Sequence, residues 1–146
     1  MVKLIRLYSN FNLRTEHKGS IILIGNFDGL HLGHQKLFAL AQHYKKKYSL
    51  KIGVLTFEPM PKMYFNKNIK NFRISNQKQK INILNKLNVD FVITKKFNKE
   101  FSKIKSIDFI KNILKKKIKA KFIFVSNNFR FGNKREGDVK QLIKYE

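Results

Sequence analysis

The sequence predicts an α/β fold, a Rossmann-like three-layer arrangement in which a parallel sheet carries helices on both faces. Short apolar runs typical of buried strands alternate along the chain with longer runs that have a helical period. Strands separated by helices pair in parallel, because each crossover returns the chain to the same edge of the sheet. A length of 146 residues and a hydrophobic content of 42% suit one compact domain. We therefore expect residues 1–146 to form a single domain.

The first half of the chain predicts the order strand, strand, helix, strand. Lys3–Tyr8 reads as a short strand and Ser20–Gly25 as a buried one. A helical pattern starts at His34. Four residues recur at the spacing of one face of this helix: Leu37, Leu40, Ala41 and Tyr44. Leu50–Phe57 is the next apolar strand.

The second half continues the alternation. A second helix follows an N-cap at Ser75 or Asn76, and it is marked by three apolar residues: Ile81, Leu84 and Leu87. Ser106 is the expected N-cap of a third helix. Two further strands are expected at Asp90–Thr94 and Lys121–Ser126. A loop should follow over residues 126–138, and a helix should begin within Val139–Tyr145.

The charge and composition narrow the class of protein. The formal net charge is +23, which by itself suggests a polyanionic partner. The lysines, however, are spread over nearly the whole chain, so we interpret them as a solvated surface and expect no specific nucleic-acid partner. Cysteine is absent, which excludes disulfides, and no apolar run approaches the ~20 residues that span a bilayer. A cytoplasmic protein without membrane contact is expected.

The segment from Gly25 to His34, GNFDGLHLGH, carries the ingredients of a phosphate site. It leaves a buried strand, contains three glycines that allow close approach of the backbone to a ligand, and opens a helix whose first N–H groups are exposed. His31 and His34 are three residues apart and can point to the same side of the first helical turn. The two histidines could instead bind a metal or be incidental, and Asp28 could be only a cap, but no third metal ligand is evident.

These residues resemble a known signature. GNFDGLHLGH resembles the G-x-F-D-G-x-H-x-G-H motif of the nucleotidyltransferase superfamily, and more narrowly the FMN adenylyltransferase module of prokaryotic FAD synthetases. Two further segments match that family in order: LTFEPMP resembles T-F-x-P-H-P, and FVSNNFRFGNKREGD resembles V-G-x-N-F-R-F-G-x-x-R-x-G-D. The resemblance runs from about Ile21 to the last residues.

The resemblance implies an activity and a set of site residues. The activity is transfer of AMP from ATP to FMN, giving FAD and pyrophosphate, with Mg²⁺ accompanying ATP. Catalytic roles fall on His31, His34 and Asn128. The implied binding residues for the nucleotide and the flavin are Gly25, Asn26, Phe27, Asp28, Gly29, Gly33, Pro59, Pro61, Phe129, Arg130, Phe131 and Gly132. No protein-held metal is expected, because Mg²⁺ can be bound by phosphate oxygens and water.

Some features depart from the family pattern. Met60 replaces the histidine of P-H-P, and Ser126 stands where glycine is usual. The chain also ends before the family's I-S-S-T-x-I-R segment, and no riboflavin kinase domain follows. We expect a domain that is cut short at its C-terminal end. Two alternatives remain open: another H-x-G-H nucleotidyltransferase, and a nucleotide-binding, flavin-binding or basic nucleic-acid-binding unit without turnover.

Overall fold

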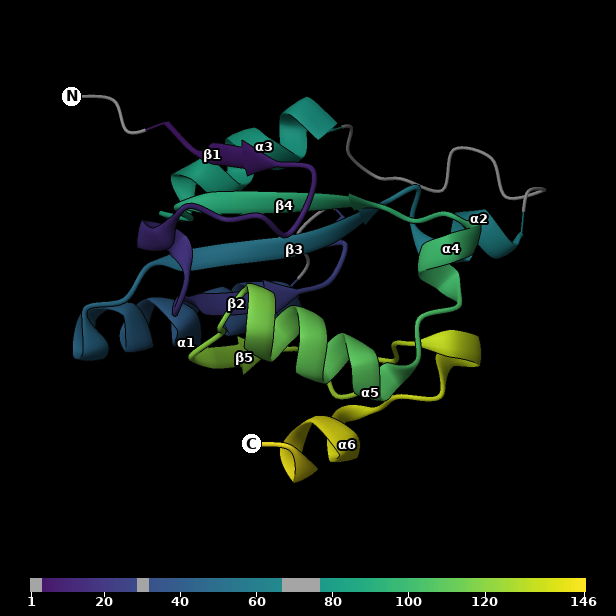
Figure 1. Cartoon of the computed structure of the whole chain (residues 1–146). Helices are drawn as coiled ribbons and strands as arrows, with labels where there is room; N and C mark the ends of the chain where they lie inside the picture. Colours follow the sequence, from purple (N-terminus) through teal and green to yellow (C-terminus); the bar gives the residue numbers. More distant parts are fainter. Residues whose placement is uncertain (1–3, 29–31, 67–76) are drawn as a thin grey trace.

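The computed structural model describes residues 4–28, 32–66 and 77–146. Within them, five strands form one sheet in the order β1-β4-β3-β2-β5, and every neighbouring pair is parallel (Figure 1). The strands are Arg6–Tyr8 (β1), Ile21–Ile24 (β2), Ile52–Glu58 (β3), Phe91–Lys96 (β4) and Phe122–Phe124 (β5). The predicted parallel α/β sheet is confirmed.

The helices of the described residues lie between these strands or beyond their carboxyl ends. They are Leu32–Tyr48 (α1), Pro61–Phe65 (α2), Gln77–Lys86 (α3), Lys99–Ser102 (α4), Ser106–Asp108 (α5) and Val139–Lys144 (α6). α5 continues directly into a π-helix, Phe109–Lys117 (η2). Two short 3₁₀ helices are Thr15–His17 (η1) and Asn133–Arg135 (η3).

The sheet is covered on both faces, which explains its apolar central strands. In β2, Ile21 and Leu23 pack in one hydrophobic cluster, which includes buried residues of α1 and α3. Ile22 and Ile24 pack in the opposite cluster, with residues of η2. Successive side chains of a strand alternate between faces, so a strand with helices on both sides is apolar throughout. In Figure 1, the helix labelled α5, which continues as η2, lies in front of the sheet. The predicted three layers are confirmed.

Several boundaries differ from the sequence prediction. α1 begins at Leu32, two residues before His34, and Ser75 and Asn76 lie outside the described residues. The prediction that Ser106 caps a helix is wrong: Ser106 is the first residue of α5, and its N–H donates to Glu136 Oε1 at 2.8 Å. A carboxylate from a distant loop thus takes the role expected of the serine hydroxyl.

Candidate active site

The carboxyl ends of the strands meet at a cavity of about 680 Å³. Its walls come from four segments: the end of β2, the β3–α2 segment, the residues after β4, and the loop after β5. Ligands of parallel α/β sheets bind at this edge, and the volume lies within the usual range for small-molecule sites. Asn26, Pro61 and Phe129, one from each of the three motif segments, all line this cavity, because each segment follows a strand of the parallel sheet.

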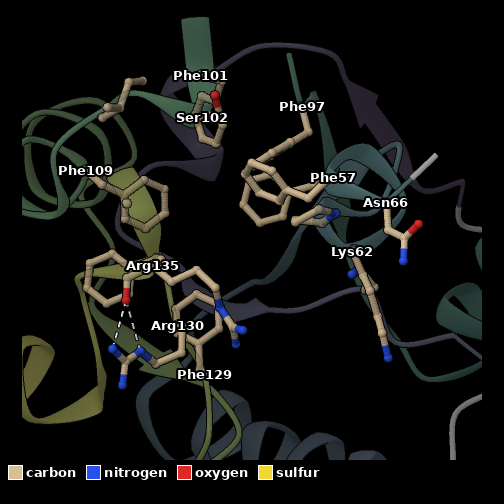
Figure 2. A pocket seen from close by; sticks show the side chains of 16 residues that line it. Phe57, Lys62, Asn66, Phe97, Phe101, Ser102, Phe109, Phe129, Arg130 and Arg135 are labelled. Atoms are coloured by element: carbon tan, nitrogen blue, oxygen red, sulfur yellow. Dashed lines mark hydrogen bonds between the residues drawn. The ribbon is translucent and has the colours of Figure 1, made fainter. Parts of the chain in front are cut away.

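Aromatic rings make up much of the wall (Figure 2). The ring of Phe101 lies 5.5 Å from that of Phe57 and 5.8 Å from that of Phe97, measured between centroids. Phe131 lies 5.4 Å from Phe109 and stacks on Phe129 at 5.5 Å. Faces and edges of such rings favour contact with another flat aromatic group. The cavity is therefore suited to a planar ring system.

Positive charge borders this aromatic wall. Lys62, Arg130 and Arg135 line the cavity, and the described lining residues include no Asp or Glu. Figure 2 shows Lys62 on one side and the two arginines on the other. These cationic side chains would attract an anionic group attached to an aromatic ring. No carboxylate among the described lining residues would repel it.

The loop after β5 is held against the start of α5 by close backbone contacts. Gly132 has φ +80°, and a Cβ at this position would lie 2.7 Å from Ser106 Cα. The next residue, Asn133, donates its N–H to the carbonyl of Ile104 at 2.7 Å. Only glycine combines the left-handed backbone with this approach. Gly132 therefore fixes the position of the loop that carries Phe129 and Phe131.

The two arginines of this loop are connected. Arg130 donates from Nε and Nη2 to the carbonyl oxygen of Arg135, at 3.1 and 2.9 Å. Lys134 and Arg135 both have left-handed backbones, with φ of 51° and 56°. The guanidinium of Arg130 thus binds the backbone of its own loop, and the Arg135 side chain extends toward the cavity (Figure 2).

After β2, the side chain of Phe27 packs on the face of the sheet that α1 covers. Phe27 is buried, with φ 52°, and its ring folds back so closely that a Cβ on Gly25 would lie 3.2 Å from Cζ. The half-buried His34 ring meets Phe27 edge to face, with centroids 5.1 Å apart. Asn26 Oδ1 accepts from the buried Thr56 hydroxyl at 3.5 Å. Phe27 and His34 therefore pack against each other and are not part of the cavity wall, whereas Asn26 is.

The predicted site residues differ in whether they line the cavity. Asp28 follows Phe27, and Gly33 lies in the first turn of α1. His31 and Gly29 lie outside the described residues, so the predicted pairing of His31 with His34 stays a prediction. Six predicted residues line the cavity: Asn26, Pro61, Phe129, Arg130, Phe131 and Gly132.

The structure shows the surroundings of the positions that depart from the family pattern. Met60 is 2% exposed and stands at the N-terminal boundary of α2, while Pro59 follows a cis peptide bond after Glu58. Ser126 donates its hydroxyl to Asn128 Oδ1 at 2.9 Å. The amide oxygen of the exposed Asn128 accepts this bond, which leaves its NH₂ group as a donor for other partners.

Sequence reasoning missed several residues of the cavity. Phe97 and Phe101 follow β4, a segment without a recognisable motif. Lys62 follows the second proline of E-P-M-P, and Arg135 is the second arginine of the β5 loop. Only their positions in the sequence could have indicated them, because each residue follows a strand and so lies at the edge of the sheet where ligands bind.

Two properties bear on metals and membranes. Within the described residues, no group of three or more His, Cys, Asp or Glu side chains is placed to hold a metal ion. Over the same part of the chain, every helix is too short or too polar to cross a bilayer.

A parallel sheet with helices on both faces and a cavity at its carboxyl edge define a Rossmann-like α/β protein. A crystal structure described as a macrolide-efflux protein from Streptococcus pneumoniae has the same fold. The two structures superpose with a TM-score of 0.78 at 24% sequence identity. The superposition covers 100% of this chain and 47% of the chain of that protein. At this identity the likeness concerns the fold alone.

The chain belongs to the FAD synthetase family, whose sequence profile matches residues 13–146. Curated relatives are named bifunctional riboflavin kinase/FMN adenylyltransferase. The protein from Buchnera aphidicola subsp. Acyrthosiphon pisum is 42% identical over 133 residues, which cover 91% of this chain and 42% of the relative. The protein from Escherichia coli K12 is 35% identical over 143 residues, covering 98% and 45%. The chain spans less than half the length of these relatives.

Proposed function

We propose that the chain is an FMN adenylyltransferase, which transfers AMP from ATP to FMN and releases pyrophosphate. The observation that carries the proposal is the cavity at the carboxyl edge, where an aromatic wall meets a cationic border without a lining carboxylate among the described residues. FMN combines a planar aromatic ring system with a phosphate, so its two parts match the two parts of the cavity. The family relationship supports the same substrates.

The chemistry needs positioning and positive charge more than a protein nucleophile. A phosphate oxygen of FMN attacks the α-phosphorus of ATP, and the bond to the bridging oxygen of pyrophosphate breaks. We assign the ATP phosphates to His31 and His34 and to the start of α1, which has 17 residues and a positive dipole end. The Phe27 ring packs edge to face against the His34 ring and supports its position. Asn128 is assigned to the reacting phosphates, with its NH₂ group as donor.

Mg²⁺ is proposed to accompany ATP. We expect this ion to be bound largely by phosphate oxygens and water, the ligands that Mg²⁺ usually keeps at nucleotide sites. Asp28, four residues after the end of β2, is the carboxylate of this motif, and its negative charge would attract the ion. Bound in this way, Mg²⁺ would neutralise charge on the phosphates.

We further propose that residues 1–146 act as one folding unit, since both hydrophobic clusters draw on strands from the whole chain. A chain without cysteine suits a reducing compartment, and we propose the cytoplasm.

The test is FAD formation followed by chromatography after incubation with FMN, ATP and Mg²⁺. His34→Ala should lower the rate by about 10²–10³, the usual cost of losing one preorganised donor. His43→Ala is the matched control, because His43 lies on the same helix but is exposed near its other end. FAD formation by His34→Ala at the parent rate would contradict the proposal, as would FMN binding without FAD formation by the parent.

A further inference from the structure

We propose that Arg135 binds the phosphate of FMN, and that Arg130 is a positioning residue that holds Arg135 in place. The sequence motif suggested Arg130 for ligand contact, and the geometry of the loop reverses the two roles. This inference rests on the proposed function, since it assigns one contact in the same cavity.

The contacts of Arg130 are directed to its own loop. Its Nε and Nη2 atoms both donate to the carbonyl oxygen of Arg135, at 3.1 and 2.9 Å. These two donors form one edge of the guanidinium fork, and arginine binds phosphate in a bidentate manner through such an edge. With that edge engaged by a carbonyl, Arg130 acts on the shape of the loop.

The backbone at Arg135 is held in an unfavourable conformation. Both Lys134 and Arg135 are left-handed, with φ of 51° and 56°. For residues other than glycine, such backbones cost free energy and persist only where the surroundings impose them. Here the turn is fixed on both flanks, since Gly132 touches Ser106 and Glu136 binds the Ser106 N–H. The left-handed turn and the Arg130 bonds together direct the Arg135 side chain toward the cavity (Figure 2).

The charge around Arg135 suits a phosphate. The side chain is exposed, and it borders the same cavity as Phe129 and, on the other side in Figure 2, Lys62. No carboxylate among the described lining residues competes for it. A flavin ring against the aromatic wall would thus leave its phosphate at a cationic border. Arg135 would then distinguish FMN from riboflavin, which lacks only that phosphate.

The test compares dissociation constants for FMN and riboflavin, measured by quenching of flavin fluorescence on the whole chain. Arg135→Gln should weaken FMN binding at least tenfold and change riboflavin binding less than twofold. Arg135→Lys should recover part of the loss because it keeps the charge. Arg14→Gln is the charge-matched control: its side chain is 58% exposed, lies outside this cavity and pairs only weakly with Glu16 at 3.8 Å. It should leave both constants unchanged.

Arg130 is tested by the same ratio of affinities. Arg130→Gln should lower the preference for FMN by a smaller factor, and it should have no further effect on that preference in the Arg135→Gln background, because positioning a missing side chain gains nothing. Thermal unfolding of each variant checks that the fold is retained.

Equal weakening of FMN and riboflavin by Arg135→Gln would assign the residue a structural role and overturn the inference. Weakened binding of ATP with unchanged FMN would also overturn it, because the phosphate served would then be that of the nucleotide. In both cases the flavin site itself would stand. Absence of binding of either flavin to the parent chain would instead refute the proposed function.

Discussion

Replacement of Gly132 by alanine should destabilise the protein more than the same replacement at Gly19. Both glycines have left-handed backbones, with φ of +80° and +79°. A Cβ at Gly19 meets no atom within 4 Å, whereas one at Gly132 would lie 2.7 Å from both Cα and N of Ser106. Both variants carry a backbone cost because φ is positive, and Gly132→Ala adds a steric cost.

The magnitudes follow from this difference. A left-handed backbone costs a non-glycine residue about 1–2 kcal/mol, so Gly19→Ala should lower the free energy of unfolding by that amount. Overpacking adds about 1–3 kcal/mol where the neighbours must move, and the neighbour here is backbone. Gly132→Ala should therefore cost about 2–5 kcal/mol.

Urea unfolding followed by circular dichroism measures both costs. FMN binding gives a second readout, because displacement of the loop moves Phe129 and Arg135; it should weaken in Gly132→Ala and not in Gly19→Ala. Equal destabilisation by the two variants, with unchanged FMN binding, would refute the close contact between this loop and the start of α5.

Two further predictions concern buried polar groups at the amino ends of the strands. Burial, together with nearby Lys51, lowers the pKa of His17 below its ordinary value of 6.5. The folded state thus favours the neutral ring, and the free energy of unfolding should fall as the pH drops through about 6.5 and level off below the folded-state pKa. Urea titrations at several pH values should show this slope in His43→Gln and its loss in His17→Gln. Asp90, 5% exposed, accepts from the Ile52 N–H at 2.8 Å and pairs with Lys45 at 3.0 Å. Asp90→Asn should cost about 1–3 kcal/mol in urea unfolding, whereas exposed Asp108→Asn should stay within about 0.5 kcal/mol; a similar loss from both would contradict the buried pair.

The elements of the fold could be predicted because burial on two faces leaves a strong mark on the sequence. The run IILI of β2 is apolar throughout, and its four residues are at most 2% exposed. Helix faces were less certain. Leu40, placed by its spacing on the apolar face of this helix, is 45% exposed, while Phe38, left off that face, is 1% exposed. Adjacent apolar residues on a helix allow two choices of face, and only packing against the sheet decides between them.

The candidate site was predicted in place but not in detail. Motif segments that follow parallel strands must meet at one edge, which is why Asn26, Pro61 and Phe129 could be brought together from sequence. The direction of a side chain in a loop depends on local backbone angles. The left-handed conformation of Arg135 has no sequence signal comparable to glycine, so the exchange of roles with Arg130 could not be read in advance.

The most direct test of the proposed adenylyl transfer is to follow the phosphorus atoms of ATP. ATP labelled at the α-phosphate is mixed with FMN, Mg²⁺ and the chain, and the products are separated. We expect the α-label in FAD, an equal amount of pyrophosphate from the β and γ positions, and a rate about 10²–10³ lower with His34→Ala. Label that stays in ATP, or that appears in AMP without FAD, would contradict the proposed reaction.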